Sequence, residues 1–204
     1  MVKRFIVLAF LSAMCLCAHG QNIVSEFVST LEGKCATFAY SYSLGGQVPL
    51  NGSGTVMLQG DSFTMKGDGL EVYCDGKVRW TLDTEAEECY IETVGDGLDI
   101  EANPALLVGA VDKAFKFNKT KSSSFNGKSV SEAILTPAVD TGIKEVSFFL
   151  TAAKVPVGAI ITSGDGSTVT ITLKDFTLKD EADISSFTLD TKKLGKNYII
   201  TDLR

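Results

Sequence analysis

Short runs in which apolar and polar residues alternate recur along most of this chain, with glycine-containing turns between them. The clearest run lies at 35–44, where large residues such as Phe38, Tyr40 and Tyr42 alternate with small or polar ones. The side chains of a β-strand point alternately to its two faces, so this period of two predicts a half-buried strand. A sheet built from such strands must have at least one of its faces covered.

Turn signals between the runs define how the expected strands follow one another. Asp75-Gly76 and Gly164-Asp165-Gly166 are typical of tight hairpins, and Asn51-Gly52 is a further turn signal. Their regular spacing predicts antiparallel neighbours. We expect a mainly β (α+β) fold: a single antiparallel sheet of about eleven strands, from 35–44 to 186–190, with two or three short helices.

Helical signals are confined to two places. Asn22 can cap a short helix whose apolar residues recur at a spacing of four. Asn103-Pro104 begins a second helix, and residues 105–114 read ALLVGAVDKA. This second helix is apolar almost all round, so it must be covered on most sides or must itself cover an apolar surface.

The first twenty residues have the pattern of a secretory signal peptide. Lys3 and Arg4 precede an almost wholly apolar run at 5–17, and Ala18 and Gly20 supply the small residues before a cleavage site. We therefore expect residues 1–20 to be a signal peptide and residues 21–204 to form one exported domain. Removal of Lys3 and Arg4 would lower the net charge from −6 to −8. We expect an exported monomer that is soluble after cleavage.

The expected mature chain has little catalytic chemistry to offer. The single histidine, His19, lies in the leader, so Ser-His and Cys-His catalysis and histidine metal ligands are excluded. Cys35, Cys74 and Cys89 lie outside any C-x-x-C motif; two of them could pair, or all three could be buried thiols. Aspartates sit at turns, which favour them for backbone reasons. We expect no enzyme, no cofactor and no metal, and the excess of acidic residues argues against nucleic acid.

Apolar surface on a β scaffold is then the feature that remains. If the sheet curls into an incomplete barrel, its concave face can enclose a hydrophobic cavity with the helices as a lid. The same alternation also fits a fully packed core. The pattern alone does not separate the two, and a filled core is the simpler interpretation.

Two segments resemble the LolA family of periplasmic lipoprotein carriers. The segment 52–63, GSGTVMLQGDSF, is followed at 70–80 by LEVYCDGKVRW. In that family a helix and a strand precede a G-x-G strand, and a strand ending in D-G-K-x-x-W and a helical stretch near N-P come later. This chain keeps the same order over essentially all of 22–204. The lipoprotein receptor LolB and the stress sensor RseB have similar folds.

The resemblance implies a function and partners. Members take the acyl chains of a lipoprotein from an inner-membrane transporter and hand them to an outer-membrane receptor. The family has a basic residue after the G-x-G strand that helps to hold the lid closed, whereas this chain has Gln59-Gly60-Asp61 there. We therefore expect either a different latch or a different cargo.

The ligand face of such a carrier should be aliphatic and aromatic. Which strand face points inward is not fixed by the pattern, because a one-residue error reverses it. Our candidate lining residues are Phe38, Tyr40, Phe63, Met65, Trp80, Leu106, Leu107, Val111 and Phe148.

Two other functions compete with the carrier. A relative of the same fold could sense a lipid, a lipoprotein or an unfolded outer-membrane protein through a signalling partner, without transferring anything. A secreted hydrolase could use acidic residues, but no carboxylate pair stands out. Transfer between two membranes separates the first alternative from a carrier, and replacement of carboxylates tests the second.

Overall fold

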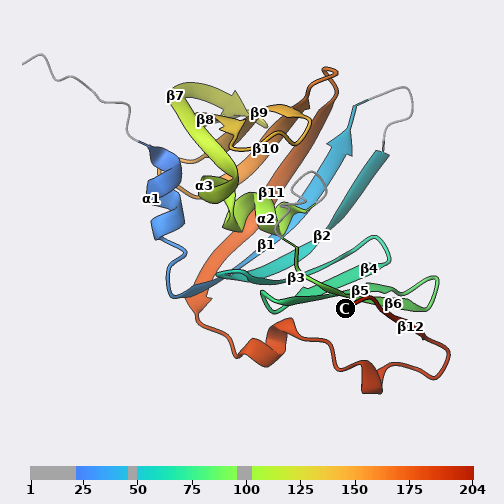
Figure 1. The fold of residues 1–204 in the computed structure, drawn as a ribbon. Coiled ribbons are helices and arrows are strands. Elements are labelled where there is room, and N and C mark those ends of the chain that lie inside the picture. The colour runs from blue at the N-terminus through green and yellow to red at the C-terminus, as the bar shows by residue number, and fades with distance from the viewer. Residues whose placement is uncertain (1–21, 46–49, 96–102) are drawn as a thin grey trace, which may run out of the picture.

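The computed structural model describes residues 22–45, 50–95 and 103–204. They form one sheet with the three short α-helices on one side (Figure 1). The helical elements are α1 (Ile23–Ser29), α2 (Pro104–Gly109), α3 (Val111–Ala114) and the 3-10 helices η1 (Ile184–Phe187) and η2 (Thr191–Lys193). The strands are β1 (Lys34–Leu44), β2 (Leu50–Gln59), β3 (Ser62–Gly67), β4 (Leu70–Cys74), β5 (Val78–Asp83), β6 (Glu88–Thr93), β7 (Phe115–Phe125), β8 (Lys128–Pro137), β9 (Ile143–Leu150), β10 (Pro156–Ser163), β11 (Thr168–Asp180) and β12 (Ile199–Asp202).

The sheet has twelve strands in the order β12-β6-β5-β4-β3-β2-β1-β11-β10-β9-β8-β7. Most neighbours in space are also neighbours in sequence, as expected for hairpins, and β1 pairs with β11 to join the two halves. All pairs are antiparallel except β12 with β6. Because β7 and β12 are edge strands, the curled sheet stays open. The expected mainly β, incomplete barrel is confirmed.

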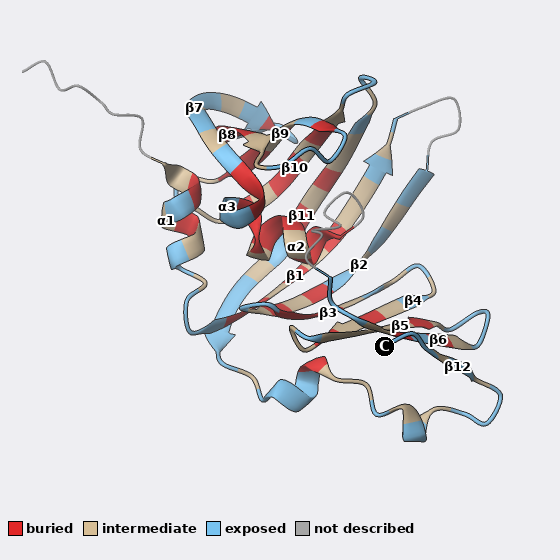
Figure 2. Cartoon of the chain, viewed as in Figure 1, coloured by how far each residue is buried: buried red, intermediate tan, exposed pale blue. Residues whose placement is uncertain are grey.

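The concave side of the sheet carries the main hydrophobic core (Figure 2). The helices α1, α2 and α3 lie on this side, and buried residues of all three belong to the same cluster. Strand side chains join it at every second position, as Ala36, Phe38 and Tyr40 do on β1. The alternation seen in the sequence is therefore the alternation between this face and the outer one.

The Asn22 cap is confirmed. Its side-chain oxygen accepts hydrogen bonds from the backbone N–H groups of Val24 and Ser25 and so begins α1. Phe27 is fully buried from this helix, with its ring centroid 5.8 Å from that of Phe148 on β9. Gly33 follows the helix at a φ of 64°, a conformation that glycine adopts without strain.

The second helix begins as expected but is broken in two. The Asn103 side chain accepts hydrogen bonds from the N–H groups of Ala105 and Leu106. At Ala110 the backbone leaves the helical region, with φ −121° and ψ 17°, so α2 ends there and α3 is a separate turn. A Cβ atom on Gly109 would lie 2.8 Å from Leu58 on β2, so glycine allows α2 to pack closely on the sheet.

The G-x-G motif of β2 lies beneath two tyrosine rings. Gly52 pairs with Tyr42 and Gly54 with Tyr40 across the β1–β2 ladder. A Cβ atom at either glycine would lie within 3 Å of the facing tyrosine ring. The rings thus occupy the space that larger side chains would need, an arrangement known from other sheets as aromatic covering of a strand glycine. The expected turn at Asn51-Gly52 is wrong, because both residues belong to β2.

The outer face of the sheet is covered at one end by the C-terminal segment. Leu82, Cys89 and Ile91 form a small buried cluster there, against which Trp80, Leu194 and Tyr198 pack. This segment corrects a second expectation. Residues 186–190 are not a strand but lie around η1, and the twelfth strand is β12, which the sequence did not indicate.

Residues 1–20, the expected signal peptide, lie outside the described residues. Within the parts of the chain that are described, no helix is long and apolar enough to cross a membrane.

Candidate functional site

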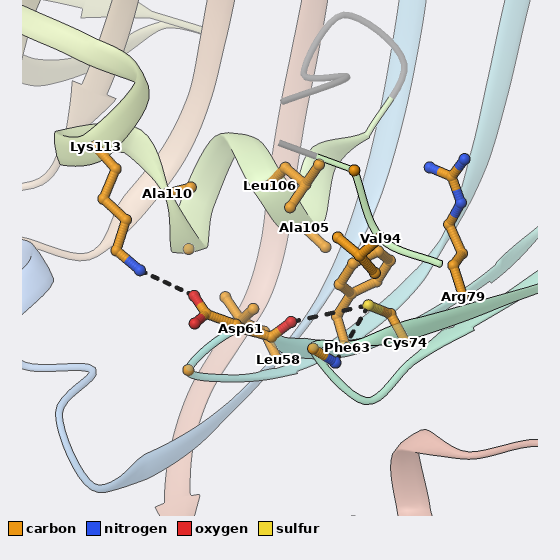
Figure 3. A pocket seen from close by; sticks show the side chains of 14 residues that line it. Leu58, Asp61, Phe63, Cys74, Arg79, Val94, Ala105, Leu106, Ala110 and Lys113 are labelled. Carbon is orange, nitrogen blue, oxygen red and sulfur yellow. Dashed lines mark hydrogen bonds and ion pairs between the residues drawn. The ribbon is translucent and has the colours of Figure 1, made fainter. Parts of the chain in front are cut away.

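A pocket of about 440 Å³ lies between the short helices and the strands β2–β5 (Figure 3). The sheet forms its floor and α2 its roof, and α3 reaches one side of its rim. Its volume is at the lower end of the range of about 300–1,000 Å³ that is typical of small-molecule sites. The concave face, which carries the main core, therefore keeps a crevice beneath α2.

One row of cross-strand neighbours builds the floor. Leu58 on β2 pairs with Phe63 on β3, Phe63 with Cys74 on β4, and Cys74 with Arg79 on β5. Residues opposite each other in antiparallel strands point to the same face, so all four line the pocket. The row ends at Glu92 on β6, which pairs with Arg79. The floor is thus apolar in the middle and charged at its outer end.

The roof is made of small and aliphatic residues. Ala105, Leu106, Gly109 and Ala110 face the floor from α2 and the residue after it. Val94, just after β6, adds a further apolar side chain that is 43% exposed. Small residues in the roof leave the space that the pocket occupies.

An ion pair joins the roof to the floor at one side of the rim. The Nζ atom of Lys113 on α3 lies 2.9 Å from Oδ1 of Asp61, in the turn between β2 and β3. The hydrogen bond to Asp61 raises the pKa of the Lys113 ammonium. Asp61 belongs to the Gln59-Gly60-Asp61 segment, where the sequence resemblance leads one to expect a basic residue. In this contact the acidic residue, Asp61, therefore belongs to the sheet side, and the basic residue, Lys113, belongs to the helix.

Gln59 makes a different connection. Its side-chain oxygen accepts a hydrogen bond of 2.7 Å from the N–H of Ala182, and its amide nitrogen donates one of 3.2 Å to the carbonyl of the same residue. Residues 59–61 thus make two anchoring contacts. Asp61 holds α3 through Lys113, and Gln59 holds the C-terminal segment through Ala182.

A second ion pair lies where the floor ends. The Nη2 and Nε atoms of Arg79 donate to one oxygen, Oε2 of Glu92, at 2.9 and 3.3 Å. Both side chains are about one-third exposed. A guanidinium therefore stands at the edge of an otherwise apolar floor.

The one thiol in the pocket belongs to a buried residue. Burial raises the pKa of Cys74, and the backbone N–H of Gly76 points at its Sγ from 3.4 Å. Cys35 and Cys89 are also buried, and none of the three forms a disulfide. A thiol with a raised pKa is mostly protonated at neutral pH and is a poor nucleophile. Within residues 22–45, 50–95 and 103–204, no three His, Cys, Asp or Glu side chains are placed to hold a metal ion.

The candidate residues from the sequence divide into three groups. Phe63 and Leu106 line the pocket. Trp80 points to the outer face, in the cluster covered by the C-terminal segment. The others lie in or against the core of the concave face, away from the pocket lining: Phe38, Tyr40, Met65, Leu107, Val111 and Phe148.

The charged lining residues were not among those candidates. Asp61, Arg79 and Lys113 come from three separate elements, and only the fold brings them to one rim. The signal that could have found Arg79 is the register of β4 with β5. The turn at Asp75-Gly76 sets Cys74 opposite Arg79, so the arginine shares the apolar face.

No protein-family description matches this sequence, and no curated protein is detectably similar to it. Among solved structures, an uncharacterised conserved protein from Thermus thermophilus matches with a TM-score of 0.56 and 8% identity, over 88% of this chain and 96% of that one. The two proteins share a fold.

Two further structures match less closely. A LolA superfamily protein from Nitrosomonas europaea has a TM-score of 0.49 and 11% identity, over 85% of this chain and 99% of that one. A putative outer-membrane lipoprotein-sorting protein domain from Vibrio parahaemolyticus has a TM-score of 0.46 and 10% identity, over 81% and 94%. A LolA superfamily protein and a lipoprotein-sorting protein domain are thus among the solved structures that this chain is similar to.

Proposed function

We propose that this protein is an exported carrier that holds acyl chains of lipoproteins in the pocket beneath α2 and delivers them to the outer membrane. The observation that carries the proposal is the apolar crevice of about 440 Å³ between a curled sheet and a cover of short helices. Binding is the activity that the described part of this lining supports, because it is mainly apolar and burial raises the pKa of its thiol, Cys74.

Apolar burial supplies enough free energy for such a carrier. Each buried methylene contributes about 0.8 kcal/mol, so a sixteen-carbon chain gains roughly 12 kcal/mol on leaving water. A shuttle must also release its cargo. The exposed Asp61–Lys113 pair contributes about 1 kcal/mol or less, so it holds the rim of the pocket weakly and can open without moving the buried side of α2 and α3.

The volume of the pocket limits how many acyl chains it can hold while α2 and α3 keep their positions over the sheet. A methylene group takes up about as much space as a water molecule in the liquid, roughly 30 Å³. The pocket therefore accommodates on the order of one long acyl chain. Binding of a lipoprotein with several chains would require α2 and α3 to move away from β2 and β3.

The proposed partners are an inner-membrane transporter as donor and an outer-membrane receptor as acceptor. The proposed location is the periplasm, on the signal-peptide pattern of residues 1–20. The net charge of −8 expected after cleavage would discourage adsorption to anionic membranes and so favour diffusion between them.

Native mass spectrometry of the protein purified from its own host tests whether it carries lipid. We expect a lipid-mass adduct, and we expect a triacylated lipopeptide to displace a hydrophobic dye from the purified protein. Absence of both the lipid-mass adduct and the dye displacement would contradict the carrier function.

Matched variants test whether the lipopeptide binds in the pocket. Leu106→Glu puts a carboxylate against the apolar floor, where the acyl chain would lie, and should weaken lipopeptide binding at least tenfold, since burying a charge beside an acyl chain is costly. Val139→Glu, at a residue that is 68% exposed and not part of the lining, is the control. Equal binding by both variants would contradict the proposed location.

A transfer assay separates the carrier from a sensor of the same fold. Donor vesicles loaded with a lipopeptide and acceptor vesicles carrying a receptor are mixed with the protein. A carrier accelerates exchange between the vesicles in proportion to its concentration. A sensor binds the lipopeptide without accelerating its exchange.

A further inference from the structure

The pocket floor changes from apolar to cationic along a single row of side chains. Leu58, Phe63 and Cys74 occupy successive strands, and Arg79 is the next residue in the row. Neighbouring strands lie about 4.8 Å apart, so the guanidinium stands one strand beyond the apolar part of the floor. A chain lying along this row would bring its head group to Arg79.

Arg79 has hydrogen-bonding capacity to spare. Both of its donors that are in use, Nε and Nη2, go to the same oxygen of Glu92. A guanidinium has five N–H groups arranged in a planar fork. Its remaining N–H groups make no hydrogen bond within the residues that the structure describes. A carboxylate or phosphate accepts two parallel N–H bonds from such a fork, which an uncharged ester or amide does not match.

A second cation flanks the same pocket from the opposite side (Figure 3). Lys113 is held by Asp61, and the two side chains are 62% and 76% exposed. Exposed ion pairs of this kind contribute about 1 kcal/mol or less, so an incoming anion can compete for the ammonium. Two cations and one carboxylate thus line the pocket of a protein whose net charge is −6.

We infer that the pocket selects single-chain amphiphiles with an anionic head, a fatty-acid carboxylate or the phosphate of a lysophospholipid, and that Arg79 is the main partner of that head. The inference rests on the proposal that the pocket holds acyl chains. Glu92 competes with the ligand for Arg79, so removing the Glu92 charge should strengthen binding and removing the Arg79 charge should weaken it.

The test compares palmitate with palmitamide, which has the same chain and an uncharged head. Dissociation constants are measured by dye displacement for the wild type, Arg79→Gln, Glu92→Gln and the control Lys34→Gln, whose ion pair with Asp180 lies outside the pocket. We expect the wild type to prefer palmitate about tenfold, as for a hydrogen bond to a charged group. The preference should vanish in Arg79→Gln, rise in Glu92→Gln and stay unchanged in Lys34→Gln.

Lysophosphatidate with the same chain identifies the head group: tighter binding than palmitate assigns the site to a phosphate, and weaker binding assigns it to a carboxylate. Equal binding of palmitate and palmitamide to the wild type, or a preference that survives in Arg79→Gln, would overturn the inference. If one of these two results is obtained but the triacylated lipopeptide still binds, the carrier function stands and only the inference about Arg79 fails. If palmitate is preferred but the lipopeptide is not bound, the carrier fails and the inference stands.

Discussion

Nζ of Lys113 on α3 lies 2.9 Å from Oδ1 of Asp61 in the β2–β3 turn, and this contact ties the cover to the sheet at the rim of the pocket. Both side chains are largely exposed, so the pair closes the rim without fixing it strongly. The sequence has no basic residue in that turn, and the base comes from the helix instead. Access to the pocket should therefore depend on this pair.

Asp61→Asn should open the rim. Loss of a pair that contributes about 1 kcal/mol at most should raise the labelling rate of Cys74 by a thiol reagent up to about fivefold. Mass spectrometry resolves the labelled site, with the buried Cys35 and Cys89 as internal references. Asp180→Asn, which breaks the comparably exposed pair with Lys34, is the control. Unchanged labelling of Cys74 would show that the pair does not guard the pocket.

Gly109→Ala should shrink the pocket with little cost to the fold. The added Cβ would lie 2.8 Å from a terminal methyl of Leu58, so the leucine side chain must move within the pocket that both residues line. The gain of about 1 kcal/mol in helix propensity offsets part of the strain. We expect lipopeptide affinity to fall while the melting temperature changes by only a few degrees. Gly45→Ala, where the nearest contact is an ordinary 3.6 Å, should change neither.

Gly54→Ala should destabilise the sheet. Its Cβ would lie 2.3 Å from the backbone carbonyl oxygen of Lys66 and 2.8 Å from the Tyr40 hydroxyl, and backbone cannot give way as a side-chain end does. Overpacking of this kind costs about 1–3 kcal/mol. Urea denaturation measures the change in the free energy of unfolding, with Gly195→Ala as the control because its nearest contact is 3.7 Å. A wild-type midpoint for Gly54→Ala would contradict the close approach of β1, β2 and β3.

The stabilising effect of Glu132 should depend on pH. Burial raises the pKa of this carboxyl, but hydrogen bonds from Ser123, Ser147 and Lys121 outweigh it, and the net pKa is lowered from 4.5. A carboxyl whose pKa is lower in the folded protein stabilises the fold above its unfolded pKa and loses this effect as the pH falls through the folded pKa.

Glu132→Gln should therefore lower the free energy of unfolding by about 1–3 kcal/mol at pH 7. The difference from wild type should shrink as the pH drops below 4.5. Urea denaturation at pH 7 and pH 3 measures it, with Glu181→Gln, at an exposed position, as the control. A constant difference between the two pH values would contradict the role of the charged form.

Trp80 should report on the C-terminal segment and not on the pocket. It is the single tryptophan, and Leu194 and Tyr198 pack against its cluster on the outer face. We expect deletion of residues 183–204 to shift its fluorescence emission to longer wavelength, because water reaches the indole. Lipopeptide binding to the intact protein should leave the emission nearly unchanged. A large shift on ligand binding would place the ligand elsewhere.

Local patterns predicted much of the fold. The Asn22 and Asn103 caps and the Asp75-Gly76 turn act over a few residues, so they can be read directly from the sequence. Period-two alternation likewise predicted the long strands. The sequence resemblance to the LolA family rested on the order of these local elements.

Non-local pairing is what the sequence did not predict. β12 is four residues long and pairs in parallel with β6, more than a hundred residues earlier in the chain. Trp80 fits the expected alternation of side chains along its strand. This alternation does not say which face of the sheet is concave, and a shift of one residue reverses the assignment of the faces. The rim contacts of Asp61 and Arg79 depend on register and on where α3 lies, so only the folded chain shows them.

The central claim is that acyl chains enter the crevice between α2 and strands β2–β5, and photocrosslinking measures this most directly. A triacylated lipopeptide with a diazirine in one acyl chain is bound to the full-length protein, irradiated and mapped by mass spectrometry. We expect crosslinks in peptides that contain Leu58, Phe63 and Leu106, and their loss when unlabelled lipopeptide is added in excess. Crosslinks confined to the outer face around Trp80, or none that unlabelled lipopeptide displaces, would contradict the claim.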